Sequence, residues 1–92
     1  NDPLVNGWLR QTVTDLLGQR KVKEAEFGMG AEDFAYMVQK VPGAMFMLGA
    51  ALPDGVERRH HTDSFNIDES VLTIGAAVLA ETARRFVTGR YP

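Results

Sequence analysis

Two adjacent histidines, His60 and His61, are the side chains of this sequence with the clearest capacity for chemistry. Histidine is the commonest metal-binding side chain, and its neutral ring binds a divalent cation such as zinc through one nitrogen. Because neighbouring residues of an extended loop point to opposite sides, one ring can face a metal ion while the other faces solvent. The alternative is a pair of solvated loop histidines without a ligand, and the two residues taken by themselves favour that alternative.

The carboxylates of Glu32 and Asp33 form a second candidate group, shortly after Gly30. The simpler interpretation of two acids at the start of an expected helix is that they stabilise the positive end of the helix dipole. Alternatively, they line a metal or substrate crevice, where the glycine lets the backbone approach a ligand closely. Gly30, Glu32 and Asp33 are therefore candidate residues of a site wall, as is His60.

The composition excludes several other kinds of chemistry. The 92 residues contain no cysteine, which excludes disulfides, thiolate metal sites and thiol nucleophiles. Ser64 lies near both histidines but lacks the turn motif of a serine hydrolase. A net charge of −2 with short basic clusters predicts no binding to nucleic acid or to a membrane surface. No segment approaches the roughly 18 apolar residues of a membrane span.

The first part of the chain combines helical and strand patterns. A helix is expected to begin at the cap formed by Asp2 and Pro3 and to end at Gly18. Residues 21–27 alternate loosely between apolar and polar, which predicts a weak strand. Residues 31–40 predict a short helix that a proline and a glycine end.

The continuous apolar run 44–48 predicts a strand covered on both faces, as in α/β sheets. A loop without periodicity, residues 50–68, follows this run and carries both histidines. With the last helix, the order is helix, strand, helix, strand, loop, helix. This order predicts the α/β class, with a parallel or mixed sheet covered by helices. Two strands are too few for such a sheet, so the chain is expected to be a portion of a larger α/β layer.

The last helix is expected to follow a capping box formed by Asn66 and Glu69. Its wet side places Glu81 one turn before Arg85, so that the two side chains can pair. Its remaining apolar residues recur at helical spacing and predict a face turned to the core. That expected core face consists of Leu72, Ala76, Leu79, Ala83 and Phe86, and Val71, Ile74 and Val78 widen it.

Three segments, Met29–Tyr36, Val41–Gly49 and His61–Glu69, together resemble one known family. Their order and spacing are similar to the C-terminal part of the co-catalytic-metal amidohydrolases and peptidases. That group includes hippurate hydrolase, N-acyl-amino-acid amidohydrolases and the plant hydrolases of indoleacetyl-amino-acid conjugates. Any one segment alone is a weak match, whereas the three together extend over essentially the whole chain.

The resemblance implies that residues 1–92 are the C-terminal segment of a split catalytic α/β domain. The upstream catalytic half and a lid or dimerisation domain would then lie outside this chain. In the family, the last metal ligand is a histidine four residues before a Phe and eight before a Glu. Counting back from Phe65 and Glu69 selects His61 and not His60. The other ligands and the glutamate that acts as general base lie upstream, so no catalytic residue is expected here.

The function that the resemblance implies is hydrolysis of the amide bond of N-acyl amino acids or peptides by a metal-activated water. Two divalent ions are expected in the complete enzyme, of zinc, manganese, cobalt or nickel. The complete enzyme is expected to be cytoplasmic and to form a homodimer or a higher oligomer, and the isolated segment is expected to be inactive.

Two departures from the family pattern lie near His61. Asp63 stands where the family often has proline, and Asn66 stands where it usually has aspartate, so position 66 lacks that charge. Two interpretations from other classes stay open beside the enzyme. One is a non-catalytic interaction domain, and the other is a small metal-sequestering module that uses His60 and His61 together.

Overall fold

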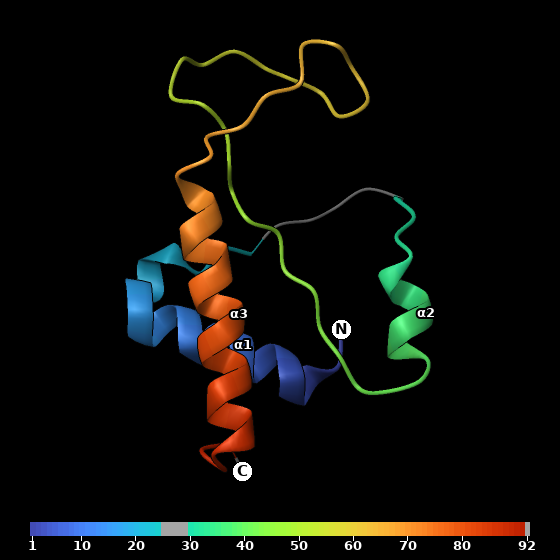
Figure 1. Ribbon diagram of the computed structural model, residues 1–92, viewed down its shortest axis with the longest axis vertical. Coiled ribbons are helices and arrows are strands. Elements are labelled where there is room, and N and C mark those ends of the chain that lie inside the picture. The colour runs from blue at the N-terminus through green and yellow to red at the C-terminus, as the bar shows by residue number, and fades with distance from the viewer. Residues whose placement is uncertain (25–29, 92) are drawn as a thin grey trace.

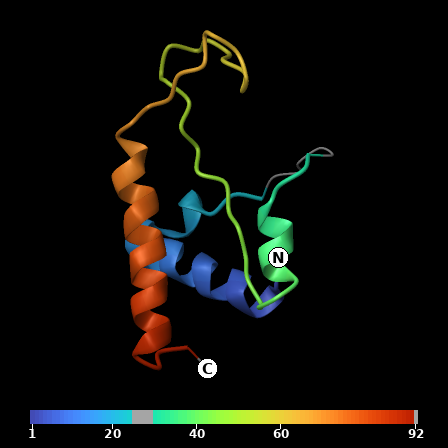
Figure 2. The same ribbon diagram turned by 45° about the vertical axis from the view of Figure 1, so that its right-hand side comes forward.

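The computed structural model describes residues 1–24 and 30–91 (Figure 1). They form α1 (Pro3–Leu17), the short 3-10 turn η1 (Gln19–Lys21), α2 (Phe34–Val38) and α3 (Val71–Val87). α1 and α3 lie across each other, and α2 stands apart from both (Figures 1 and 2). Between α2 and α3 the chain follows an irregular path to a loop beyond the start of α3. No helix in the described residues is long and apolar enough to cross a membrane.

The first turn of α1 is stabilised by the capping side chain of Asp2 and by Pro3 at the first helical position. Oδ1 of Asp2 accepts hydrogen bonds from the backbone amides of Leu4 and Val5, each at 3.0 Å. Pro3 occupies the first helical position, where a missing amide donor costs nothing. Gly18 ends the helix with a φ of 93°, which few residues other than glycine adopt. Both predicted ends of this helix are confirmed.

The core lies where α1 crosses α3. Leu9 and Val78 are the buried apolar side chains of the described residues, and burying each contributes roughly 1.5–3 kcal/mol. Thr12 is fully buried, and its hydroxyl lies 2.7 Å from the hydroxyl of Tyr91. The ring of Tyr91 stacks on Trp8 with a centroid distance of 4.9 Å. The C-terminal tail that follows α3 is therefore held against α1 by the side chain of Tyr91.

Ion pairs on one side of α3 reinforce this crossing. Arg85 donates to Asp15 of α1 at 2.6 Å and to Glu81 at 2.8 Å, which confirms the predicted pair one helical turn apart. Arg84 also donates to Glu81, at 2.7 Å. Hydrogen bonds from Arg84 and Arg85 lower the pKa of Glu81 to about 2, and that from Arg85 lowers the pKa of Asp15. These carboxylates therefore stay ionised throughout the neutral range.

The start of α3 differs from the prediction. Oδ1 of Asn66 accepts a hydrogen bond from the next amide, that of Ile67, at 2.9 Å. Oδ1 of Asp68 accepts from the amide and the hydroxyl of Ser70, at 3.0 and 2.6 Å. The helix begins only at Val71, so the predicted capping box is wrong. Short polar side chains here bond to nearby backbone in turns instead, which competes with helix initiation.

The buried face of α3 agrees with the prediction only in part. Val78 is buried as expected and Gly75 is buried beside it, whereas Leu72 and Leu79 of the expected core face are 55% and 58% exposed. Gly75 permits a close approach, since a Cβ atom there would lie 2.8 Å from Cδ2 of Leu48. The contact of α3 with Leu48 is therefore made at Gly75, and the larger residues Leu72 and Leu79 lie on an adjacent side of the helix.

The predicted α/β sheet is wrong for this chain, because residues 1–24 and 30–91 contain helices and no strand. The run Ala44–Leu48 has no regular structure. Residues 21–24 of the predicted weak strand belong to η1 and to irregular chain, and residues 25–27 lie outside the described residues. The predicted helix 31–40 is present only as the five residues of α2.

The missing strand has a physical cause, because a strand needs neighbours that pair with its backbone. The side chain of Asn1 supplies such a pairing to Met45 alone: Nδ2 donates to its carbonyl at 2.8 Å, and Oδ1 accepts from its amide at 2.9 Å. In the described part of the chain, no group hydrogen-bonds to the backbone of residues 46–49. The apolar pattern is therefore present without the partners that would make it a strand.

The chain exposes more surface than a folded protein of its mass normally does. Its accessible surface is 7650 Å². A folded monomer of 10.2 kDa is expected to expose about 5,300 Å². The radius of gyration, 14.8 Å, likewise exceeds the value of about 12 Å expected for this length. Much apolar surface therefore remains uncovered.

Candidate functional site

The loop that carries the two histidines is braced from within. Its ends are joined by a hydrogen bond of 2.9 Å from the amide of Asp68 to the carbonyl of Ala50. Arg58 donates two hydrogen bonds to the carboxylate of Asp54, at 3.1 and 2.6 Å. These bonds from Arg58 lower the pKa of Asp54 to about 2, so the pair is charged at neutral pH. The loop thus has defined ends and a charged brace although it contains no helix.

His61 lies in a turn held by local hydrogen bonds. The hydroxyl of Thr62 donates to the carbonyl of Arg59 at 2.7 Å, and the amide of Phe65 donates to the carbonyl of Thr62 at 3.3 Å. His61 has a φ of 61°, and within the described residues no other non-glycine residue has a positive φ. The left-handed conformation costs a residue with a side chain roughly 1–2 kcal/mol. The surrounding turn must therefore hold His61 in place.

The two histidine rings have different neighbours. The ring of His60 lies 5.2 Å from that of Phe65, and the centroids of His60 and His61 are 6.5 Å apart with planes at 70°. Both residues are exposed, and neither ring has a hydrogen-bond partner among residues 1–24 and 30–91. Phe65 served only as a spacing marker in the sequence, and its contact with His60 was not predicted. The two rings thus lie edge to face within one turn, and the expectation that one of them faces a metal ion stays a prediction.

The second candidate group lies at the start of α2. Gly30, Glu32 and Asp33 are all exposed. Oε1 of Glu32 accepts a hydrogen bond from the amide of Phe34, the first residue of α2, at 3.3 Å. This contact is the helix-start role that acids commonly have. The possible role of these residues in a crevice stays a prediction.

Within the part of the chain that the structure describes, no three His, Asp or Glu side chains come together as a metal site. One exposed imidazole, His61, fits a single position of a divalent-metal centre, which normally needs three or four protein ligands. The described residues therefore do not form a complete centre by themselves. Any further ligands would have to come from outside them.

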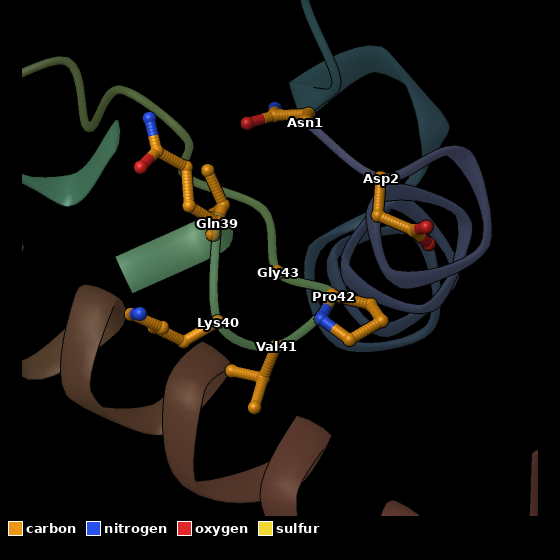
Figure 3. A pocket seen from close by; sticks show the side chains of 8 residues that line it. Asn1, Asp2, Gln39, Lys40, Val41, Pro42 and Gly43 are labelled. Carbon is orange, nitrogen blue, oxygen red and sulfur yellow. The ribbon is translucent and has the colours of Figure 1, made fainter. Parts of the chain in front are cut away.

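Two pockets of the described residues lie away from the histidine loop. One, of about 390 Å³, is lined by the N-terminus and the segment after α2, including Asn1, Asp2 and Pro42 (Figure 3). The other, of about 450 Å³, lies between α1 and the C-terminal tail beside Trp8 and Arg85. Neither pocket is lined by a residue that the sequence singled out for chemistry.

Comparison with known proteins identifies the class of this chain. The model of peptidase family M20/M25/M40 matches residues 1–85. The chain therefore belongs to this peptidase family, and the family resemblance of its three sequence segments is confirmed. No solved structure matches the chain.

Individual relatives show how much of a family member this chain represents. IAA-amino acid hydrolase ILR1-like 6 of Arabidopsis thaliana is 36% identical over 92 residues, which cover 99% of this chain and 20% of the relative. YhaA of Bacillus subtilis, provisionally named an amidohydrolase, is 40% identical over 85 residues, 90% of this chain and 21% of the relative. A Rhodococcus jostii protein provisionally named glutamate–cysteine ligase 2-3 is 36% identical over 84 residues, 91% and 11% respectively. The chain thus spans about a fifth or less of these relatives.

Proposed function

We propose that this chain is the part of a metal-dependent amidohydrolase that supplies one metal ligand, His61. Membership of the peptidase family and the hydrolase names of two relatives support hydrolysis of an amide bond. The substrate class that we propose is an N-acyl amino acid or a peptide. The complete enzyme would form a homodimer or a higher oligomer.

The observation that carries this proposal furthest is the backbone of His61. The histidine that the family spacing selects is also the residue held in the left-handed conformation, at a φ of 61°. Strained backbone of this kind persists where the surroundings impose it, and it is common at functional sites. His60, the neighbour that the spacing rejects, packs its ring near Phe65 instead.

A divalent-metal pair, when bound, lowers the pKa of a shared water and polarises the scissile carbonyl. The role of this chain would be to hold the imidazole of His61 in position within the loop 50–68. A neutral imidazole adds no negative charge to the centre, so the ions keep their capacity to polarise the substrate. The remaining ligands and the general base would come from outside the described residues.

A hybrid enzyme tests this proposal. The chain replaces the matching segment of the Arabidopsis hydrolase ILR1-like 6, with which it aligns over 92 residues. Metal content and hydrolysis of an indoleacetyl-amino acid are then measured. We expect His61→Ala to lose bound metal and to lower kcat/KM by more than the roughly 10- to 100-fold that loss of an outer-shell partner costs. The matched control, His60→Ala, should keep both.

Two results would contradict the proposal. One is a His61→Ala hybrid that keeps its full metal content and turnover. The other is hydrolysis of an amide by the free 92-residue chain, which carries too few metal donors to form a centre. Tight one-to-one zinc binding by the free chain, measured by calorimetry and lost in both His60→Ala and His61→Ala, would favour a metal-sequestering module instead.

A further inference from the structure

Thr62 belongs to two consecutive turns, the first of which contains His61. The hydroxyl of Thr62 donates to the carbonyl of Arg59 at 2.7 Å, and this bond spans both histidines. The carbonyl of Thr62 accepts from the amide of Phe65 at 3.3 Å, which closes the next turn. Thr62 is therefore the residue that the two turns share, and it follows His61 directly in the chain.

The first turn needs support because of the backbone of His61. With residues 59 and 62 at its ends, His61 is the third residue of this turn, and its φ is 61°. A positive φ at the third position is found in type II turns, where glycine or asparagine is the usual residue. Histidine adopts this conformation at a cost in free energy, so another interaction of the turn must offset that cost.

The side chain of Thr62 provides such an interaction. A four-residue turn is commonly closed by a hydrogen bond to the carbonyl of its first residue. The hydroxyl of Thr62 reaches that carbonyl, on Arg59, at the ordinary length of a hydrogen bond between two oxygens. Threonine and serine hydroxyls often bond to the carbonyl three residues earlier and stabilise turns in this way.

A second hydroxyl adds to this bond. Oγ of Ser64 lies 3.2 Å from Oγ1 of Thr62. The hydroxyl of Thr62 has a single proton, which it donates to the carbonyl of Arg59. Ser64 is therefore the donor of the pair, and the oxygen of Thr62 accepts from Ser64 while its proton is donated onward. Hydrogen bonds linked in this order polarise and strengthen one another.

Little else in the loop can fix the position of His61. Within the loop 50–68, all of which the structure describes, the other hydrogen bond that spans position 61 joins Asp68 to Ala50 at the loop ends. A metal-binding histidine commonly donates from its second ring nitrogen to an acceptor that fixes the ring. The ring of His61 has no such acceptor among residues 1–24 and 30–91. The bond from Thr62 is therefore the nearest constraint on the ligand.

We propose that Thr62 is the positioning residue of the metal ligand His61. Its hydroxyl closes the turn and thereby holds the left-handed backbone that sets where the imidazole lies. This role rests on the proposed function of His61 as a metal ligand. Without the hydroxyl, a smaller fraction of molecules has the ligand in place, so the apparent affinity for the metal falls by that fraction. The chemical step, once the metal is bound, does not depend on Thr62.

Metal titration of the hybrid enzyme tests this role. The hybrid is the Arabidopsis hydrolase ILR1-like 6 that carries this chain in place of its matching segment. The probe is zinc or manganese, whichever supports turnover, at free concentrations set by a chelator. Thr62→Val removes the hydroxyl and should raise the apparent Kd for the metal roughly three- to tenfold, the loss of one hydrogen bond. At saturating metal, kcat and KM should stay nearly unchanged, and Thr62→Ser should restore the affinity.

Thr88→Val is the matched control. The hydroxyl of Thr88 donates to the carbonyls of Arg84 and Arg85 at 2.8 and 3.3 Å, so the same substitution removes the same kind of bond at the end of α3. This variant should bind the metal as the wild type does. An equal loss of affinity in Thr62→Val and Thr88→Val would overturn the proposal, as would failure of Thr62→Ser to restore it.

The free chain provides a second measurement, which needs neither metal nor activity. Because Thr62 is shared by both turns, Thr62→Val should speed hydrogen exchange of the Phe65 amide roughly three- to tenfold, and Thr62→Ser should not. An unchanged exchange rate in Thr62→Val would overturn the proposal even if the hybrid is inactive. His61→Ala decides the metal-ligand proposal separately. If that variant loses the metal while Thr62→Val keeps full affinity, only the positioning role fails.

Discussion

The crossing of α1 and α3 and the loop that carries the histidines are held together in different ways. At the crossing, the bonds join residues far apart in sequence: Thr12 meets Tyr91, and Asp15 meets Arg85, 79 and 70 positions apart. In the loop, most bonds span four residues or fewer, such as those between Arg58 and Asp54. The crossing is therefore a small tertiary structure, whereas the loop is a series of local turns joined at its ends.

The chain forms the crossing by itself, whereas a metal centre at the loop would need ligands from outside the described residues. The crossing buries Leu9 and Val78 and pairs its charges without outside help. The loop presents His61, but no group of three possible metal ligands comes together among the described residues. The same division runs through α3, where Gly75 and Val78 are buried and Leu72 and Leu79 are exposed. Substitutions on the two sides should therefore have very different effects.

The largest expected effect comes from placing a charge on the buried side of α3. Val78 is 2% exposed, so Val78→Asp would bury an unpaired carboxylate and destabilise the fold by about 3 kcal/mol or more. Leu79→Asp makes the same kind of change at the next residue, which is 58% exposed, and should cost within about 1 kcal/mol. Urea unfolding followed by circular dichroism measures both. Similar losses of stability would mean that the two sides of α3 are not distinct.

A smaller effect is expected when acid protonates the carboxylates of the crossing. The pKa of Glu81 is lowered to about 2 from its ordinary value of 4.5, because Arg84 and Arg85 donate hydrogen bonds to it. A lowered pKa in the folded state means that the stabilisation is complete above pH 4.5 and is lost as the pH falls toward 2. The melting temperature should therefore fall over that range, and Glu81→Gln should flatten the fall.

Glu57→Gln is the control for this titration. Glu57 lies in the loop, its side chain is 78% exposed, and its contact with Arg59 is longer, at 3.3 Å. Such an exposed pair contributes little to stability. An acid response that changes as much with Glu57→Gln as with Glu81→Gln would show that the crossing does not depend on its ion pairs.

Several features of the fold that depend on nearby residues were predictable from the sequence, although the capping box of Asn66 and Glu69 was wrong. The cap at Asp2, the positive φ of Gly18 and the pair of Glu81 with Arg85 are confirmed, since each needs partners within a helical turn. The sheet prediction was wrong, because the apolar pattern of Ala44–Leu48 cannot provide the neighbours that a strand requires. The buried face of α3 was predicted only in part. Val78 is buried as expected, whereas the larger residues that hydrophobicity favoured are exposed and Gly75, which was not predicted, is buried.

The candidate site was predictable in its identity but not in its geometry. Spacing to Phe65 and Glu69 singled out His61, and the family match supports the comparison that supplied this spacing. No sequence pattern indicated the left-handed backbone at position 61, because histidine has only a weak preference for that conformation. The assignment of His61 as a metal ligand stays a prediction, as do the roles of Gly30, Glu32, Asp33 and His60.

The smallest expected effect tests whether the backbone of His61 is strained. Glycine adopts a positive φ without cost but loses more conformational entropy on ordering, roughly 0.5–1 kcal/mol. At position 60 only the entropy cost applies, so His60→Gly should speed hydrogen exchange of the Phe65 amide by about fivefold. At position 61 relief of strain offsets that cost, so His61→Gly should leave the exchange rate nearly unchanged. Equal acceleration by both substitutions would mean that the turn stores no strain at His61, and that its left-handed backbone gives no support to a metal-binding role.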